Sequence, residues 1–278
     1  MKNNSTHYVE NPDWNNICLV CGTRYQDAMP ESCAICNDER QYVPPTGQKW
    51  TSYVAMSRAN TIRIGNPLPD VYDLRISPAF GIGQLAHLVV SPGGNLLWDC
   101  IPFIDEATIA FIRSKGGLRG IAISHPHYYS LMKAWADAFE CPVYLHQADK
   151  QWVLDGSDRV RFFEGAKQVL WDGMEIVHTG GHFAGSTILH APQTGKEGSV
   201  FAGDTLQIAP SRQFISIMYS YPNVIPLPVS KILSIAGIVN PLAFDSMYGA
   251  FEWQKIHTGA KEIFTRTIAR YEEIYGHG

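Results

Sequence analysis

Four of the six cysteines of the chain fall into two short pairs, and this spacing constrains the fold more than any other feature. The pairs are Cys18-x2-Cys21 and Cys33-x2-Cys36. Two such turns can bring four thiolates together in a tetrahedron around one Zn²⁺ ion. A segment this short has little hydrophobic core, so we expect the metal to stabilise it. The sequence predicts a small zinc-ribbon-like module, a four-cysteine zinc knuckle, over residues 1–48, which ends at the Pro/Gly connector VPPTGQ.

Two alternatives stay open for these cysteines. A rubredoxin-like iron centre uses the same paired spacing, and Gly22 after Cys21 fits that pattern. Disulfides would need an oxidising compartment. The N-terminus has no apolar core of the kind that a signal peptide needs, so we expect a cytoplasmic protein with reduced thiols. Cys100 and Cys141 lie apart from the pairs and are expected to be buried.

Residues 49–278 read as two strand-rich halves, each followed by helices. In the first half we expect strands at 61–64, 71–76, 85–90, 95–98, 120–124 and 142–145, and helices at 105–114, 131–139 and 148–154. In the second half we expect strands at 167–170, 174–178, 186–190 and 199–202, and helices at 229–240 and 252–275. This order predicts an α/β fold in four layers, an αββα sandwich.

Several polar residues stand at the ends of these expected strands. His125 and His127 lie in AISHPHYYS, His182 lies in TGGHFAGS, and Asp204 lies in FAGDTL. Together with HLVVSPGGNLLWDC, these segments come in an order that resembles the metallo-β-lactamase fold hydrolases over about residues 70–275. The resemblance implies that His125, His127, His182 and Asp204 bind a metal. It also implies that Asp99 is a structural aspartate near them.

The same resemblance shows what is missing. The family signature is His-x-His-x-Asp-His, and here Tyr129 and Ser130 replace its Asp and second-metal His. Ala250 stands where the family has its final His. The resemblance therefore implies a site for one metal instead of two. His277 is interpreted as a tail residue, and His257 is expected inside the last helix. The remaining histidines are expected to be structural: His87, His146, His178 and His190. Of these, His87 is the reserve candidate for a ligand, because in the resembled family the strand that it begins often ends near the metal.

Three neutral imidazoles with an open position form a competent zinc site. Such a site lowers the pKa of a bound water to about 7, which makes hydroxide available at neutral pH. Asp204 could complete the coordination or accept a proton. Tyr129 could donate to a developing anion, because a phenol both donates and accepts hydrogen bonds. We expect Asp204 and Tyr129 to be catalytic and Tyr128 to be a packing residue.

The surroundings of the site indicate the substrate. The segment QFISIMYSYPNVIPLPVS after Asp204 carries no charged residue. It predicts an apolar pocket formed by Phe80, Phe214, Ile217, Met218, Tyr219 and Tyr221. Such a pocket would suit a small, neutral electrophile. Within the family, the chain is most similar in this respect to bacterial isothiocyanate hydrolases, although a lactone or thioester hydrolase would use the same groups.

Other functions remain open. An iron-dependent persulfide dioxygenase of the same fold would bind one Fe through His125 or His127, His182 and Asp204. A non-catalytic member would use its zinc module for protein contacts. The net charge of −4, without a block of Lys or Arg, argues against nucleic acid or anionic membranes as partners. We expect a small-molecule substrate and no membrane span. The oligomeric state is open, and a dimer would be compatible with the sequence.

Overall fold

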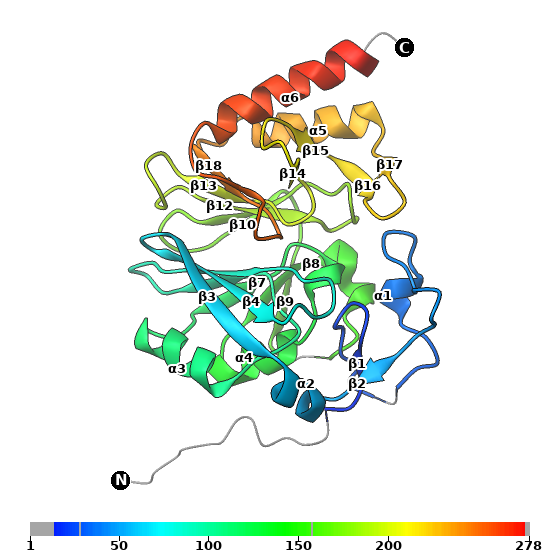
Figure 1. The fold of residues 1–278 in the computed structure, drawn as a ribbon. Coiled ribbons are helices and arrows are strands. Elements are labelled where there is room, and N and C mark those ends of the chain that lie inside the picture. Colours follow the sequence, from blue (N-terminus) through cyan, green and yellow to red (C-terminus); the bar gives the residue numbers. More distant parts are fainter. Residues whose placement is uncertain (1–13, 28, 157, 276–278) are drawn as a thin grey trace.

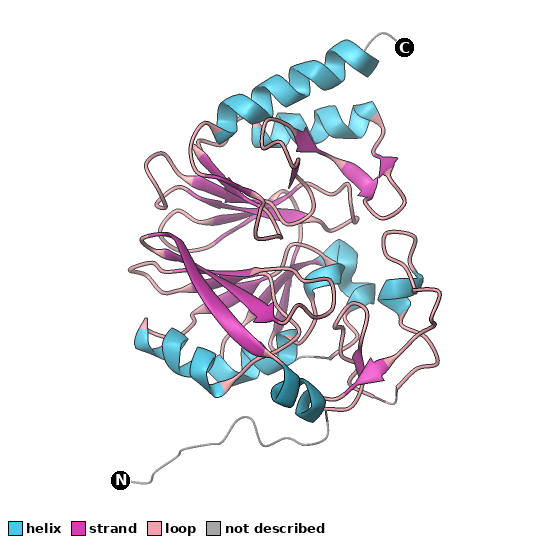
Figure 2. Ribbon diagram, viewed as in Figure 1, coloured by secondary structure: helices cyan, strands magenta, loops and turns pink. Residues whose placement is uncertain are grey.

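The computed structural model describes residues 14–27, 29–156 and 158–275, and it has the predicted four-layer architecture. Two large sheets face each other, and helices cover the outer face of each (Figures 1 and 2). This confirms the α/β sandwich expected from the two strand-rich halves. In the part of the chain that the structure describes, no helix is long and apolar enough to cross a membrane.

The first sheet contains seven strands that are ordered as they are in the chain. They are β3 (Thr61–Leu68), β4 (Val71–Ser77), β5 (Ala86–Val89), β6 (Leu96–Trp98), β7 (Gly120–Ala122), β8 (Val143–His146) and β9 (Val160–Phe163). Strands β3 to β6 are antiparallel, and β6 to β9 are parallel. The parallel strands are joined through α3 (Glu106–Ser114) and α4 (Met132–Phe139), because parallel neighbours need a crossover.

The second sheet contains six strands in the order β10-β11-β12-β13-β18-β19. They are β10 (Lys167–Val169), β11 (Glu175–His178), β12 (Thr187–Ala191), β13 (Ser199–Phe201), β18 (Ser246–Tyr248) and β19 (Lys255–Ile256). Helices α5 (Val229–Val239) and α6 (Ala260–Tyr275) cover it. Between β13 and α5 lie two short hairpins: β14 (Gln207–Ile208) with β15 (Ile215–Ser216), and β16 (Met218–Ser220) with β17 (Ile225–Pro226).

Alternation along the central strands separates the hydrophobic core into layers. Leu97 packs toward the helices of the first half, whereas its neighbour Trp98 packs between the sheets. Val200 and Phe201 repeat this division in the second half. Successive side chains of a strand point to opposite faces, so a strand that is covered on both faces is apolar throughout. The sheets are therefore fixed relative to each other, and so are the loops at their ends.

The cysteine segment packs beside the first sheet. Strand β1 (Ile17–Cys18) pairs with β2 (Trp50–Thr51), and helices α1 (Ala34–Asn37) and α2 (Tyr53–Ala59) complete this region (Figure 1). Trp152 and Leu154 of the larger part of the chain pack against the cysteines. The module thus shares a hydrophobic cluster with the sandwich.

Two expected helices differ from the structure. The sequence predicts an α-helix over residues 148–154, but the segment is the 3₁₀ helix η2 (Gln147–Trp152). The last helix begins at Ala260 instead of Glu252, because Lys255 and Ile256 pair with β18 as strand β19. Gly259 then separates the strand from the helix at a φ of +72°, a conformation that glycine adopts without strain. His257 consequently lies outside the helix and is exposed.

Candidate metal centre

The four paired cysteines converge as predicted. Cys18, Cys21, Cys33 and Cys36 are buried, and one ligand atom from each lies within 4.8 Å of the others. The Sγ atoms of Cys18 and Cys36 are 3.6 Å apart, as are those of Cys21 and Cys33. Bonds of about 2.3 Å to a tetrahedral zinc would separate the sulfurs by roughly 3.8 Å. The four thiols are free and spaced so that the cluster fits a metal ion.

The first pair of histidines leaves the end of β7. The chain turns there through the short 3₁₀ helix η1 (Pro126–Tyr128), with Pro126 at its first position and His125 extended before it. Asp99 anchors this turn, because its Oδ1 accepts a hydrogen bond of 2.7 Å from the Ser124 amide. Burial raises the pKa of Asp99 to about 7. Asp99 therefore has the structural position expected of it.

His182 and Asp204 come from the second sheet, where they follow β11 and β13. His182 Nδ1 and the Tyr219 carbonyl are 2.8 Å apart, so the ring donates there and directs Nε2 inward. Asp204 follows Gly203, which has a φ of +52°. A Cβ atom on Gly203 would overlap Ser124 Oγ, the hydroxyl that contacts His125 Nδ1. Only glycine fits between these two ligand segments.

The four side chains form one compact group. Asp204 Oδ2 lies 3.3 Å from His125 Nε2, 3.9 Å from His182 Nε2 and 4.0 Å from His127 Nδ1. His182 Nε2 and His127 Nδ1 are 3.4 Å apart. A tetrahedral zinc with bonds of about 2.0–2.1 Å would hold such atoms roughly 3.3–3.4 Å apart. His125 Nε2 is buried without a hydrogen-bond partner among the described residues. The group thus fits a metal ion.

The electrostatics of the group agree with metal binding. Burial lowers the pKa of His127 to about 4 and that of His182 well below its usual value. Both imidazoles are therefore neutral at pH 7, as ligation requires. Burial alone would raise the pKa of Asp204, but the neighbouring imidazoles of His125 and His127 hold it well below the usual range. Three imidazole nitrogens and one carboxylate thus face a common point.

Tyr128 packs in the core as expected, and it also has a contact with the site that the sequence does not predict. Tyr128 donates a hydrogen bond of 2.8 Å to Asp204 Oδ1, so it is more than a packing residue. The rings of both tyrosines lie in the hydrophobic core of the first half, and neither lines the cavity at the metal group, but no hydrogen bond joins Tyr129 to the described residues of that group. The phenol that can act on the site is therefore that of Tyr128.

The positions that differ from the family signature, Tyr129, Ser130 and Ala250, are buried. Ala250 belongs to the same core as Tyr129. Gln84 Nε2 donates to Ser130 Oγ at 3.1 Å. Within the described ranges, the cysteine cluster and the cluster of three histidines with Asp204 are the two groups that could hold a metal ion. The histidines and Asp204 that the sequence predicts as ligands thus lie in one group.

A cavity of about 130 Å³ opens onto the metal group. His127, His182 and Asp204 line it together with Arg40, Gln41, Ile82, Gln207, Tyr221, Pro222 and Phe251. Of the expected apolar pocket only Tyr221 is present. Ile217 is buried in the second core, and Phe214 is exposed beside α6. The sequence does not predict Arg40 and Gln41 here, because they come from the cysteine module, whose position the motifs do not reveal.

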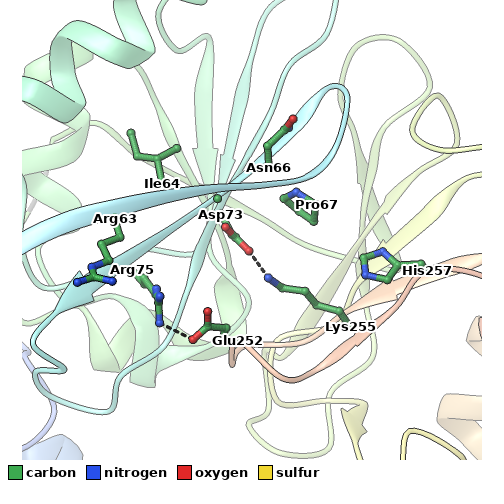
Figure 3. A pocket seen from close by; sticks show the side chains of 10 residues that line it. Arg63, Ile64, Asn66, Pro67, Asp73, Arg75, Glu252, Lys255 and His257 are labelled. Atoms are coloured by element: carbon green, nitrogen blue, oxygen red, sulfur yellow. Dashed lines mark hydrogen bonds and ion pairs between the residues drawn. The ribbon is translucent and has the colours of Figure 1, made fainter.

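His257 faces a different cavity, of about 340 Å³, between the β3–β4 hairpin and residues 252–257 (Figure 3). Lys255 pairs with Asp73 there, and Arg75 pairs with Glu252. His257 is thus away from the metal group. His277 lies outside the described residues. The other expected structural histidines contact backbone carbonyls: His87 with Gly249, His146 with Gly165, His178 with Ala184 and His190 with Ala243.

The fold is that of the metallo-β-lactamases. The DIM-1 metallo-β-lactamase superposes with a TM-score of 0.56 at 15% identity, over 77% of this chain and 98% of that enzyme. A metallo-β-lactamase from Erythrobacter litoralis gives 0.56 at 13% identity, over 76% of this chain and 96% of that one. These likenesses establish the fold alone. No family model matches the sequence.

The chain also has a relative that is similar in sequence. The chain is 40% identical over 260 residues to the uncharacterized protein YmaE of Bacillus subtilis (strain 168), a match that covers 92% of this chain and 94% of YmaE. The protein thus belongs to the same family as YmaE.

Proposed function

We propose that the protein is a metal-dependent hydrolase. The observation that carries this proposal is the convergence of four ligand atoms within 4.8 Å of one another, from His125, His127, His182 and Asp204. Three of these residues, His127, His182 and Asp204, line a cavity. Three imidazoles suit Zn²⁺ and leave one position for a water molecule, whose pKa the bound ion would lower to about 7. The cysteine cluster would hold a second, structural zinc.

Residues of the chain would bind the ion and accept the proton of the water molecule. The neutral imidazoles of His127 and His182 leave their lone pairs for the ion. Asp204 Oδ1 is occupied by Tyr128, so Oδ2 is the oxygen that faces the imidazoles and can accept a proton from water. Tyr221 donates to the Asp204 carbonyl at 2.8 Å and fixes the turn that carries the carboxylate. The walls thus orient one proton acceptor toward the reacting centre.

The proposed substrate is a small neutral electrophile, with an isothiocyanate as the leading candidate. The cavity is small, and the guanidinium of Arg40 in its wall is engaged by both oxygens of Asp38. An anionic substrate would have to compete for this cation or enter unpaired, at a cost of a few kcal/mol. A linear N=C=S group is narrow and uncharged. Addition of water to its carbon yields an amine and carbonyl sulfide.

The test compares two substrates with metal-loaded protein at neutral pH. We expect kcat/KM for 2-phenylethyl isothiocyanate to exceed that for a glutathione thioester, because glutathione brings charges that the cavity does not neutralise. A tenfold preference for the thioester would assign the protein to the thioester hydrolases. Metal analysis is the second arm. Iron at the histidine group, with oxygen uptake on a persulfide, would replace hydrolysis by dioxygenase chemistry.

A further inference from the structure

The residues that directly follow the fourth cysteine reach the histidine group. Cys36 lies in α1, Asp38 caps the end of that helix, and Arg40 follows two residues later. Arg40 Nη1 donates a hydrogen bond of 3.0 Å to the His182 carbonyl. Its guanidinium is oriented by Asp38, with Nε at 2.6 Å from Oδ1 and Nη2 at 2.7 Å from Oδ2. The group also stacks over Phe183, 3.7 Å from the ring centroid.

Glu39 contacts Tyr219, the residue whose carbonyl orients the His182 ring. The ring of His182 donates from Nδ1 to the Tyr219 carbonyl, as described above. The Tyr219 hydroxyl donates to Glu39 Oε1 at 2.5 Å. The Glu39 carbonyl accepts from Ser220 Oγ at 2.7 Å and from Asn223 Nδ2 at 2.6 Å. Both the backbone of His182 and the carbonyl that orients its ring are therefore tied to the segment after Cys36.

We propose that Arg40 is a positioning residue for His182 and that, through it, the cysteine cluster couples to the histidine group. A metal on the cysteines fixes α1, α1 fixes Asp38, and Asp38 holds the guanidinium against the His182 carbonyl. Residues that orient metal ligands typically change metal affinity about 10–100-fold when they are lost. Coupling of this kind is reciprocal, so a metal on the histidines also favours retention of the metal on the cysteines.

The experiment compares Arg40→Met with Arg24→Met. Arg24 belongs to the same module and is paired with Asp155, away from the histidine group. Competition with a chelator measures the affinity of the histidine group, while native mass spectrometry verifies that the cysteines still hold their metal. We expect Arg40→Met to weaken the histidine group about tenfold or more. Arg24→Met is expected to lower the melting temperature and to leave that affinity nearly unchanged.

A spectroscopic measurement distinguishes a change in the position of His182 from a general loss of protein stability. With zinc on the cysteines and cobalt on the histidines, Arg40→Met should change the cobalt absorption spectrum and Arg24→Met should not. If Arg40→Met does not fold, Arg40→Lys serves instead. It keeps the charge but cannot form the fork with Asp38, so we expect a weakened histidine group as well.

Unchanged affinity in the Arg40 variants would overturn the proposal, and so would equal losses in the Arg40 and Arg24 variants. The proposal rests on the metal group invoked for the proposed function. Its test measures metal retention, however, so a failure to hydrolyse isothiocyanates would leave the result intact.

Discussion

The Tyr128 hydroxyl donates a hydrogen bond to Asp204 Oδ1 at 2.8 Å, and both side chains are buried. The hydrogen bond occupies one carboxylate oxygen and turns the other toward His125, His127 and His182. A buried carboxylate oxygen that loses its donor is costly, and the carboxylate could then rotate. This contact is therefore part of the metal group, although Tyr128 offers the ion no atom itself.

Tyr128→Phe should weaken metal binding at the histidine group about tenfold or more, because it frees Asp204 Oδ1. The measurement is a chelator competition on folded protein. Tyr129→Phe is the matched control, since within the described ranges no hydrogen bond of that hydroxyl is found and its ring lies in the core. If the two variants lose the same metal affinity, the hydrogen bond between Tyr128 and Asp204 does not account for the loss.

His182→Ala should remove one metal per chain and abolish turnover, because it deletes one of three imidazoles. Native mass spectrometry counts the metal, and steady-state kinetics with the isothiocyanate measures the loss. His257→Ala changes an exposed histidine at the other cavity and should alter neither quantity. An active His182→Ala protein would contradict the assignment of the metal group.

The double variant Cys18→Ser/Cys36→Ser should carry no metal at the cysteine cluster, because two remaining thiolates cannot complete a tetrahedral site. We also expect a marked loss of thermal stability, since this region has little core of its own. Cys141→Ser changes a buried thiol outside the cluster and should keep the metal. An unchanged metal count in the double variant would disprove the site.

His87 should make the protein less stable in mild acid. Burial lowers the pKa of His87 from 6.5 to about 4 in the folded state. Below pH 6.5 the unfolded chain binds a proton that the folded chain does not, so the free energy of unfolding falls as the pH drops toward 4. The shift corresponds to roughly 3 kcal/mol over that range.

His87→Gln tests this dependence, because glutamine does not titrate. Urea unfolding gives the free energy of unfolding of wild type and variant at pH 7 and at pH 5. The difference between the two proteins in the change with pH isolates His87, because the contributions of other acid-sensitive groups cancel. The variant should lose less stability between the two pH values. Equal losses would mean that His87 is protonated in the folded state.

Much of the fold and of the metal group could be predicted because the signals are local. Each ligand lies in the loop after a short strand: His125 and His127 follow β7, His182 follows β11 and Asp204 follows β13. The choice between Tyr128 and Tyr129 could not be made in this way. It depends on the turn η1, which brings the Tyr128 hydroxyl to Asp204 although both tyrosine rings pack in the same core.

Other features depend on contacts between distant segments. Ile256 fits the helical spacing of the residues after it, but pairing with β18 draws it into a strand. Tertiary pairing here overrides local periodicity. Arg40 reaches His182 only because the cysteine module packs beside the sandwich, and no motif signals that contact. The charged wall of the cavity could therefore not be predicted from the uncharged loops.

The metal ligands come from both halves of the molecule. His125 and His127 follow a strand of the first sheet, whereas His182 and Asp204 follow strands of the second. A bound ion would thus act as a cross-link between the two sheets, closing a long loop as a disulfide does and limiting the conformations of the unfolded chain. The two halves of the loaded protein could not slide apart before the ion is released. Resistance to unfolding would then be set by the lifetime of the metal complex as well as by the apolar contacts between the sheets.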